Sequence, residues 1–180
     1  KDTQKISYKQ LHQKVSKAAN GLKKLGIQKG DRVTIYLTMI PELAILMLAC
    51  ARIGAVHSII FGGFSAESIS GRVNECKSEY IITDDEVVRG GKTIPLKATT
   101  DEALSNCPDV KKCIVVKRTG NYVYWEQGRD VWYHDLIKDV PNYCEPEEMS
   151  AEEHVCSIYR SGATGKHKGV LQTNGGCMVY

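Results

Sequence analysis

The stretch that decides the fold is "DRVTIYLTMIPELAILMLACARIGAVHSII", which runs from Asp31 to Ile60. Its first seven residues alternate between two sets of side chains, one of them wholly aliphatic after the leading Asp, and this pattern is typical of a strand. Pro41 suits the first turn of a helix that is apolar nearly all round, and Gly54 can end that helix. A second strand follows over residues 55–60. A strand, a helix and a strand in this order predict a right-handed crossover between parallel strands.

The same alternation extends in both directions. Upstream, Ser7 and Gln10 have the spacing of a capping box, and an amphipathic helix runs from there to Gly26. Downstream, the pattern predicts strands at 80–83, 113–116, 153–159 and from 169, and helices at 65–76, 94–107, around 133–138 and after 173. Residues 117–149 break the alternation and read as a surface excursion. The expected class is α/β, with helices on both faces of a mainly parallel sheet.

Composition limits the kinds of partner that the chain can have. The chain has 180 residues, enough for one well-packed domain, and its net charge of +3 is spread along the sequence. With 7% aromatic residues as well, the composition does not indicate a nucleic-acid surface. The longest apolar run, from Leu43 to Ala51, is shorter than the roughly 20 residues that a membrane helix needs. We expect no membrane span, and nothing in the sequence indicates an oligomeric state.

The cysteines bear on the cellular compartment. There are seven of them, an odd number, and no two form a C-x-x-C pair. This usage predicts reduced thiols in an intracellular, cytoplasmic protein. The sequence opens with Lys1 rather than Met, so we expect that a beginning is missing, and a targeting segment could be missing with it.

The segment "YRSGATGKHKG", from Tyr159 to Gly169, carries the strongest indication of chemistry. Its three glycines permit consecutive N–H groups to face one anion, and its two lysines add positive charge. The spacing is not that of a Walker loop, and strands are expected on both sides, so a hairpin loop is favoured. Composition leaves two interpretations open, a loop for a triphosphate or an exposed glycine-rich turn.

This segment closely resembles the signature Y-T-S-G-S-T-G-K-P-K-G-V of the adenylate-forming superfamily. Other stretches resemble the acetyl-CoA synthetase family within it: "MLACARIGAVHSIIFGGFSAESISGRV", "RGGKTIPLK", "CIVVKRTG" and "EQGRDVWYHDL". The resemblance runs nearly from end to end. It implies that residues 1–180 are part of the N-terminal, AMP-binding domain of such an enzyme, with the C-terminal domain absent from this chain.

The resemblance implies a two-step ligase, with acetate, ATP with Mg²⁺ and coenzyme A as its small-molecule partners. Acetate attacks the α-phosphate of ATP to give acetyl-adenylate and pyrophosphate, and the thiol of coenzyme A then displaces AMP. The family's acyl pocket, acidic Mg²⁺ motif and essential lysine lie beyond these residues. We therefore expect no catalytic residue and no metal ligand within the chain, which alone should be inactive, and the preference for acetate over other acids cannot be deduced from it.

The resemblance also implies two sets of binding residues. Contacts to the phosphates of ATP are implied for Arg160, Ser161, Gly162, Ala163, Thr164, Gly165, Lys166 and Lys168. Contacts to coenzyme A are implied for Phe61, Gly62, Gly63, Arg89, Gly90, Gly91 and Lys92. Without the resemblance, the second set would be read as an ordinary turn between strand and helix and a solvated loop. Family members often have a second Arg in place of Lys92, which keeps the charge but not the bidentate geometry.

Three positions depart from the family signature: Arg160 replaces Thr, Ala163 replaces Ser and His167 replaces Pro. If the missing Ser hydroxyl donates to a phosphate, its loss costs roughly 1.5–3 kcal/mol, about ten- to a hundredfold in affinity. Two hypotheses follow: part of a working acetate–CoA ligase, or a truncated, non-catalytic remnant with at most weak nucleotide or coenzyme A binding. A dinucleotide-dependent dehydrogenase is disfavoured, because no G-x-G-x-x-G follows the first strand.

Four further expectations concern a histidine, an acidic run, two tryptophans and the last strands of the sheet. His57 should be a hydrogen-bonded core residue rather than a catalyst, and the acidic run Asp84–Glu86 should be a solvated loop. Trp125 and Trp132 should anchor the excursion. Because the chain stops just as a helix should begin after Thr173, part of the sheet should lack neighbours and expose apolar surface.

Overall fold

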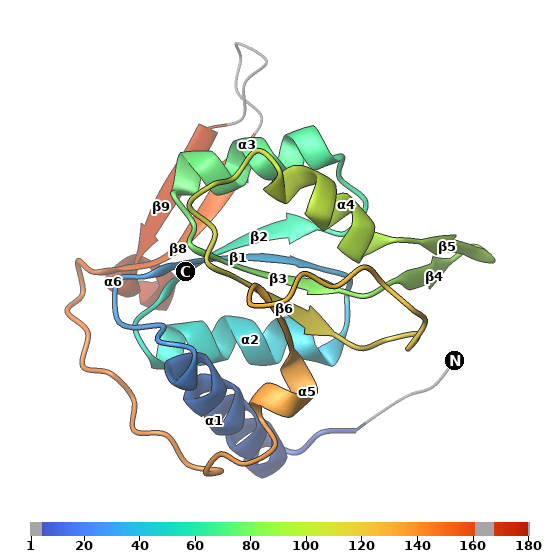
Figure 1. Cartoon of the computed structure of the whole chain (residues 1–180). Coiled ribbons are helices and arrows are strands. Elements are labelled where there is room, and N and C mark those ends of the chain that lie inside the picture. The colour runs from blue at the N-terminus through green and yellow to red at the C-terminus, as the bar shows by residue number, and fades with distance from the viewer. Residues whose placement is uncertain (1–4, 161–167, 180) are drawn as a thin grey trace.

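The computed structural model describes residues 5–160 and 168–179. A seven-stranded sheet forms its centre, with the strand order β7-β6-β3-β1-β2-β8-β9 (Figure 1). All pairings are parallel except that of β9 with β8. The strands are β1 (Arg32–Leu37), β2 (Val56–Phe61), β3 (Tyr80–Asp84), β6 (Lys112–Val116), β7 (Asp130–Trp132), β8 (His154–Arg160) and β9 (Lys168–Thr173). The predicted mainly parallel sheet is confirmed.

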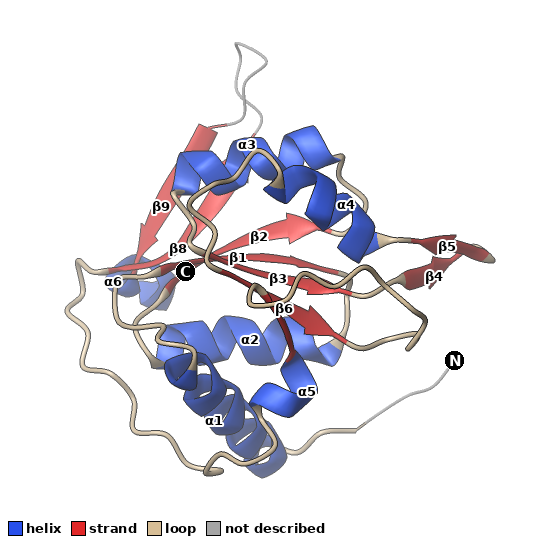
Figure 2. Ribbon diagram, in the orientation of Figure 1, coloured by secondary structure: helices blue, strands red, loops and turns tan. Residues whose placement is uncertain are grey.

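Helices cover both faces of this sheet (Figure 2). On one face lie α1 (Tyr8–Lys24), α2 (Pro41–Arg52) and the short α5 (Tyr133–Leu136). On the other face lie α3 (Ala66–Cys76) and α4 (Leu96–Leu104). A short α6 (Asn174–Val179) follows β9 and packs against the β8–β9 pair. Each layer has its own buried apolar cluster, so the α/β class is confirmed.

Strand β1 shows why the sheet needs both layers. Its aliphatic set, including Val33 and Ile35, belongs to the core beneath α1 and α2. The alternate residues Thr34 and Tyr36 are equally buried, and the Tyr36 ring packs in the second core beneath α3 and α4. Burial on both faces is typical of a parallel strand, whose neighbours are joined by helical crossovers.

Local sequence signals set the helix ends as predicted. The Ser7 hydroxyl accepts from the Gln10 N–H at 3.3 Å, while the Gln10 side chain accepts from the Ser7 N–H at 2.8 Å. Pro41 opens α2, and Gly54 follows its end with a φ of +70°. A helix that is apolar nearly all round is expected to be buried on every side, and for α2 that expectation is wrong: Leu48 is 46% exposed, so the helix is buried on one side only.

Three short strands were not predicted, two of which form a hairpin. The "RGGK" segment is the turn of a β-hairpin formed by β4 (Val87–Arg89) and β5 (Lys92–Ile94), in which Arg89 pairs with Lys92. Gly90 and Gly91 form its turn with φ values of +59° and +76°, the left-handed backbone that a two-residue hairpin turn needs. The third is the three-residue strand β7, which extends the sheet beyond β6.

The β8–β9 pair and α6 leave apolar side chains in solvent. They are Ile158, Val170, Leu171, Met178 and Val179, with exposed fractions from 40% to 84%. The predicted exposure of apolar surface at this end of the sheet is confirmed. In the part of the chain that the structure describes, no helix has the length and apolar character needed to cross a membrane.

Candidate functional site

The loops at the carboxyl ends of β1, β2 and β3 meet at one edge of the sheet. From β1 the chain passes first to β2 on one side and then to β3 on the other, so the direction of winding reverses at β1. The crossovers that leave β1 and β3 therefore turn to opposite faces, as the helices α2 and α4 show in Figure 1. Ligands of open α/β sheets tend to bind at such a reversal.

The "FGGF" turn after β2 is fixed in shape by residues of the neighbouring strand. The hydroxyl of Tyr36 accepts from the Gly63 N–H at 3.2 Å and donates to the Phe64 carbonyl, also at 3.2 Å. Gly63 has a φ of +114°. A Cβ on Gly62 would lie 2.9 Å from Cγ2 of Thr38, closer than real side chains approach. Both glycines are therefore required by the geometry of the turn.

Asp84 fastens the end of β3 to the end of β1. Its Oδ2 accepts from the backbone N–H of Thr38 at 3.1 Å and from the Thr38 hydroxyl at 2.6 Å. The residue is fully buried, and its Oδ1 has no hydrogen-bond partner among the described residues. Burial raises the pKa of Asp84, although the hydrogen bonds from Thr38 oppose that rise. Asp84 thus holds the Thr38 side chain against which Gly62 packs.

The prediction of a solvated acidic loop at 84–86 is wrong. Asp85 is as fully buried as its neighbour. Its carboxylate accepts from the backbone N–H groups of Glu86 at 2.7 Å, Arg118 at 2.8 Å and Gly120 at 2.9 Å. These bonds satisfy buried backbone donors where β3 and β6 end, and that is the physical reason for the burial.

The second segment implied for coenzyme A lies at the same edge. Arg89 and Lys92 are both exposed and sit opposite each other across the β4–β5 turn, and among residues 5–160 and 168–179 neither forms an ion pair. Strand β5 leads directly into α4, whose first residue, Leu96, lies 3.4 Å from where a Cβ on Gly62 would be. The start of α4 therefore connects the "FGGF" turn with the hairpin.

The structure describes the strands on both sides of the predicted phosphate loop but not the loop itself. Residues 161–167 lie outside the described residues, so the roles implied for Ser161, Gly162, Ala163, Thr164, Gly165 and Lys166 stay predictions. The backbones of the flanking strands pair antiparallel up to Arg160 opposite Lys168. This confirms the predicted strands on both sides of the loop and a hairpin connection rather than a strand-to-helix one.

Tyr159, the first letter of the signature, attaches this hairpin to α3. Its hydroxyl donates to the Arg72 carbonyl at 3.2 Å and lies 2.7 Å from Sγ of Cys76. Its ring also covers Gly169 on the paired strand, where a Cβ would lie 3.5 Å from Cε1. Burial raises the pKa of Tyr159, so the hydroxyl stays protonated and can donate. Sequence reasoning assigned this residue no role.

A buried ion network explains other parts of the resembling stretches. Lys97 is fully buried, and its Nζ lies 2.7 Å from Oδ1 of Asp101 and 2.9 Å from Oδ2 of Asp130. Arg129 contacts the same two carboxylates, at 2.5 Å and 2.7 Å. Burial alone would raise the pKa of Asp130, but hydrogen bonds from Arg129 and Lys97 outweigh it and hold that pKa below its usual value. The network joins α4 to β7 and was not predicted.

The remaining candidates behave as structural residues. His57 is 6% exposed in β2, which confirms its place in the core; burial lowers its pKa to about 4, against a hydrogen bond with the Val155 backbone. Its Nδ1 has no partner among the described residues. Trp125 and Trp132 stack at 4.6 Å between ring centroids and pack against the core beneath α3 and α4, which confirms them as anchors of the excursion.

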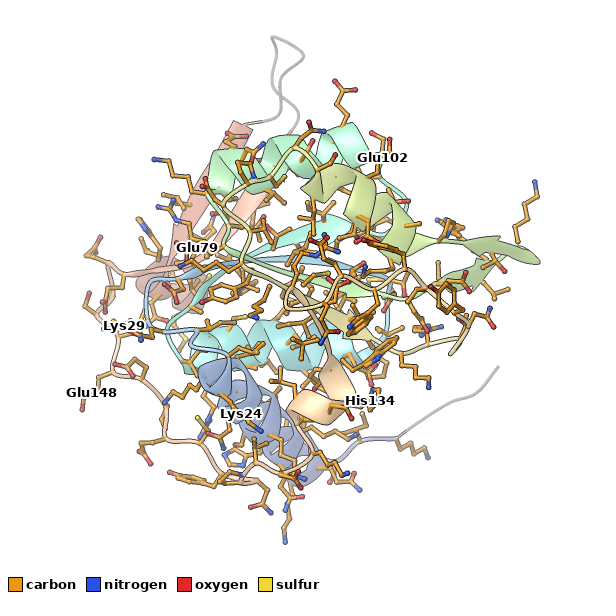
Figure 3. The ribbon with its side chains drawn as sticks, in the orientation of Figure 1. Lys24, Lys29, Glu79, Glu102, His134 and Glu148 are labelled. Atoms are coloured by element: carbon orange, nitrogen blue, oxygen red, sulfur yellow. The ribbon has the colours of Figure 1, made fainter. Side chains whose placement is uncertain are left out.

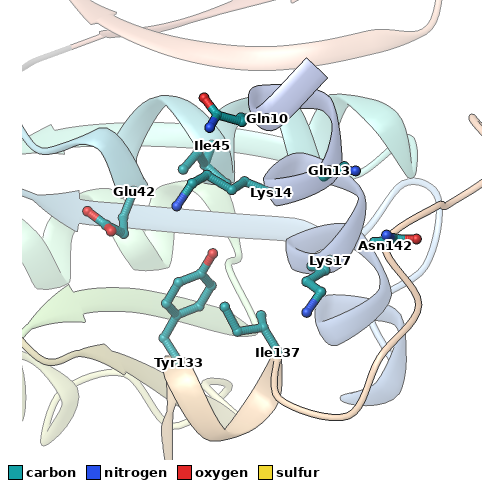
Figure 4. A pocket seen from close by; sticks show the side chains of 9 residues that line it. All are labelled: Gln10, Gln13, Lys14, Lys17, Glu42, Ile45, Tyr133, Ile137 and Asn142. Atoms are coloured by element: carbon teal, nitrogen blue, oxygen red, sulfur yellow. The ribbon is translucent and has the colours of Figure 1, made fainter. Parts of the chain in front are cut away.

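Two further surface features lie away from the carboxyl edge of the sheet. A hollow of about 460 Å³ between α1, α2 and α5 is lined by residues such as Lys14, Glu42 and Tyr133 (Figure 4). On the surface at the amino end of the sheet, Nζ of Lys29 donates to the Glu148 carbonyl at 2.7 Å (Figure 3).

The fold and the arrangement of this edge agree with comparisons to known proteins. The chain belongs to the AMP-binding enzyme family, whose model matches residues 1–179. It is similar to acetyl-coenzyme A synthetases: 60% identical over 176 residues to that of Parvibaculum lavamentivorans and 56% identical over 177 residues to that of Yersinia pseudotuberculosis. These matches cover 98% and 97% of the chain and 27% of each relative.

A comparison with a solved structure supports the same fold. The acetoacetyl-CoA synthetase from Streptomyces lividans matches with a TM-score of 0.89 and 26% identity, over 99% of this chain and 27% of that one. The chain thus spans about a quarter of the length of the proteins it matches. The resemblance to acetyl-CoA synthetases and the α/β fold class inferred from the sequence are confirmed.

Proposed function

We propose that residues 1–180 are part of the AMP-binding domain of an AMP-forming acetate–CoA ligase, and that they position ATP and coenzyme A. The observation that carries the proposal is the construction of the carboxyl edge of the sheet. There a turn that only glycine can form lies beside a hairpin with two exposed cations, Arg89 and Lys92. Among the residues that the structure describes, no carboxylate forms an ion pair with either cation. The high identity to acetyl-coenzyme A synthetases supports the choice of substrates.

For ATP, the proposal assigns binding to the loop between β8 and β9. Backbone N–H groups around Gly162 and Gly165, with the ammonium groups of Lys166 and Lys168, would hold the β- and γ-phosphates. Acetate then attacks the α-phosphorus, and pyrophosphate departs with the charge that the lysines offset. This chain contributes orientation rather than a nucleophile. The described residues include no group of three His, Cys, Asp or Glu that could hold a metal ion.

For coenzyme A, the proposal assigns the adenosine end to the "FGGF" turn. The exposed ring of Phe61 and the close backbone of Gly62 and Gly63 offer a surface on which an adenine can lie. Arg89 and Lys92, held opposite each other across the hairpin turn, are suited to contact the phosphates. The thiol of coenzyme A would then displace AMP from the acetyl-adenylate.

The second candidate, a non-catalytic remnant, is favoured by the three departures in the signature at Arg160, Ala163 and His167. The two candidates differ in what those departures do to ATP affinity. If the chain comes from a working ligase, they are tolerated. If it is a remnant, they have weakened phosphate binding by about ten- to a hundredfold, and restoring the family residues should recover that factor.

The test is a calorimetric titration of ATP into the 180-residue chain and into the Arg160→Thr/Ala163→Ser/His167→Pro variant. We expect measurable ATP binding by the chain and a gain of less than about threefold in the variant; a gain of tenfold or more supports the remnant. Lys166→Gln serves as the site control, and it should weaken binding in both backgrounds. Absence of ATP binding in both, or an unchanged affinity in Lys166→Gln, would contradict the proposed role of the loop. Neither protein should release pyrophosphate when acetate is added.

A further inference from the structure

Arg72 in α3 is a buried cation. Only 7% of it is exposed, and among residues 5–160 and 168–179 no carboxylate lies within ion-pair distance of its guanidinium. One of its nitrogens donates to the Ser68 carbonyl at 3.0 Å within the same helix. A charge removed from water in this way needs compensation from its surroundings.

The compensation comes from two aromatic rings. The guanidinium carbon lies 4.6 Å from the centre of the Phe64 ring and 5.5 Å from the centre of the Tyr159 ring. Both distances fall within the range of a cation–π interaction. Arg72 is therefore held by ring faces instead of carboxylates, and any movement of either ring changes the environment of a buried charge.

These two rings belong to the two segments proposed to bind substrates. Phe64 ends the "FGGF" turn, whose shape the Tyr36 hydroxyl fixes at the Phe64 carbonyl. Tyr159 begins the ATP signature and is further attached to α3 by its bond to the Arg72 carbonyl at 3.2 Å. One side chain thus contacts both segments, although they are 95 positions apart in the sequence (159 − 64).

We propose that Arg72 is a positioning residue that couples the coenzyme A turn to the ATP hairpin. A ligand that shifts Phe64 changes how strongly Arg72 holds Tyr159, and the reverse follows because coupling between binding sites is reciprocal. The planar guanidinium can face two rings at once, whereas an ammonium group is a point charge that cannot. This inference rests on the proposed function, because it needs both segments to bind their ligands.

The test measures coupling rather than affinity alone. The dissociation constant of coenzyme A is determined with and without saturating ATP for the 180-residue chain and for Arg72→Lys. We expect ATP to change the affinity for coenzyme A by about fivefold or more in the chain, and the ratio to fall toward one in Arg72→Lys. Phe64→Leu, which removes one ring and keeps the charge, should lower the ratio as well and serves if Arg72→Lys does not fold.

The matched control is Arg52→Lys in α2. Arg52 also lies over an aromatic ring, 5.9 Å from the centre of Tyr143, and its Nε donates to the Cys144 carbonyl, outside the described parts of both proposed segments. It should leave the ratio unchanged. An unchanged ratio in Arg72→Lys, or an equal fall in Arg52→Lys, overturns the inference while leaving the proposed function intact.

A ligand-free measurement separates the two failures. If the chain binds neither ligand, the proposed function fails, and amide hydrogen exchange at Ile158 and Tyr159 then decides on the coupling itself. Phe64→Leu should accelerate exchange there in the original background and have no further effect once Arg72 is Lys. Exchange at these amides that does not respond to Phe64→Leu would overturn the coupling.

Discussion

Two pairs of cations in this chain, Lys97 with Arg129 and Arg89 with Lys92, have different environments. Lys97 is buried and Arg129 is half-buried, and each contacts the carboxylates of Asp101 and Asp130. Lys92, five positions before Lys97 in the same resembling stretch, is exposed across the hairpin turn from Arg89. Residue type alone therefore does not identify a ligand-binding cation. A charge neutralised by carboxylates stabilises the fold, whereas one left in solvent at the carboxyl edge is available to a phosphate.

Removing the buried cation Lys97 should have the largest effect on stability. Lys97→Met leaves the buried carboxylate of Asp130 and the half-buried one of Asp101 with Arg129 as their cation, and removing one partner of a buried ion pair typically costs about 3–5 kcal/mol of stability. Urea denaturation followed by the fluorescence of the Trp125–Trp132 pair measures the loss.

The control for this variant comes from the exposed pair. Lys92→Met should change the free energy of unfolding by less than about 0.5 kcal/mol, as is usual for surface substitutions. Equal destabilisation by the two substitutions would show that the buried network does not have the structural role assigned to it.

A second buried group gives a pH dependence that the exposed cations should not share. Burial lowers the pKa of His57 to about 4 from its ordinary value of 6.5. Between these pH values the unfolded chain binds a proton on His57 that the folded chain does not, so stability is present above pH 6.5 and is lost as the pH falls toward 4. The full difference is at most about 3 kcal/mol.

The measurement is the free energy of unfolding at several pH values between 7 and 4. The difference between the chain and His57→Gln should shrink as the pH falls, because the variant lacks the titrating group. His134→Gln, at an exposed histidine, is the matched control and should follow the parent curve. A constant offset between the chain and His57→Gln would contradict the lowered pKa.

Local signals explain how much of the fold could be predicted from the sequence. The Ser7 cap, Pro41 and Gly54 act on their own neighbours, and each marked an element correctly. The three residues of β7 are too few to show any periodicity. The Gly90–Gly91 pair does indicate a hairpin turn, but its strands are as short as β7, so the sequence does not distinguish the hairpin from a loop.

Contacts between distant residues explain what could not be predicted about the site. The burial of Asp85 could not be predicted because two of the backbone N–H groups that donate to its carboxylate, those of Arg118 and Gly120, lie 33 and 35 residues away in the sequence. The partner of Lys97 in β7 is equally remote, so the sequence shows the charge without its neutralisation. The cation–π contacts of Arg72 join segments that only the sheet order brings together. Resemblance located the binding segments, and packing alone shows how they are held.

The smallest effect is expected for the exposed pair, Arg89 and Lys92. Arg89→Gln/Lys92→Gln should leave the urea midpoint unchanged, because neither side chain contacts a described acid, and should weaken coenzyme A binding by about ten- to a hundredfold through lost charge-assisted contacts. Lys23→Gln/Lys24→Gln, at the end of α1, changes the net charge equally and separates local contacts from overall charge. Calorimetric titration at two salt concentrations should find binding by the parent chain weakened by salt, and binding by the hairpin variant affected much less. An equal loss of coenzyme A affinity in the two double variants would assign the effect to net charge. The exposed pair would then not be a specific binding site for the phosphates.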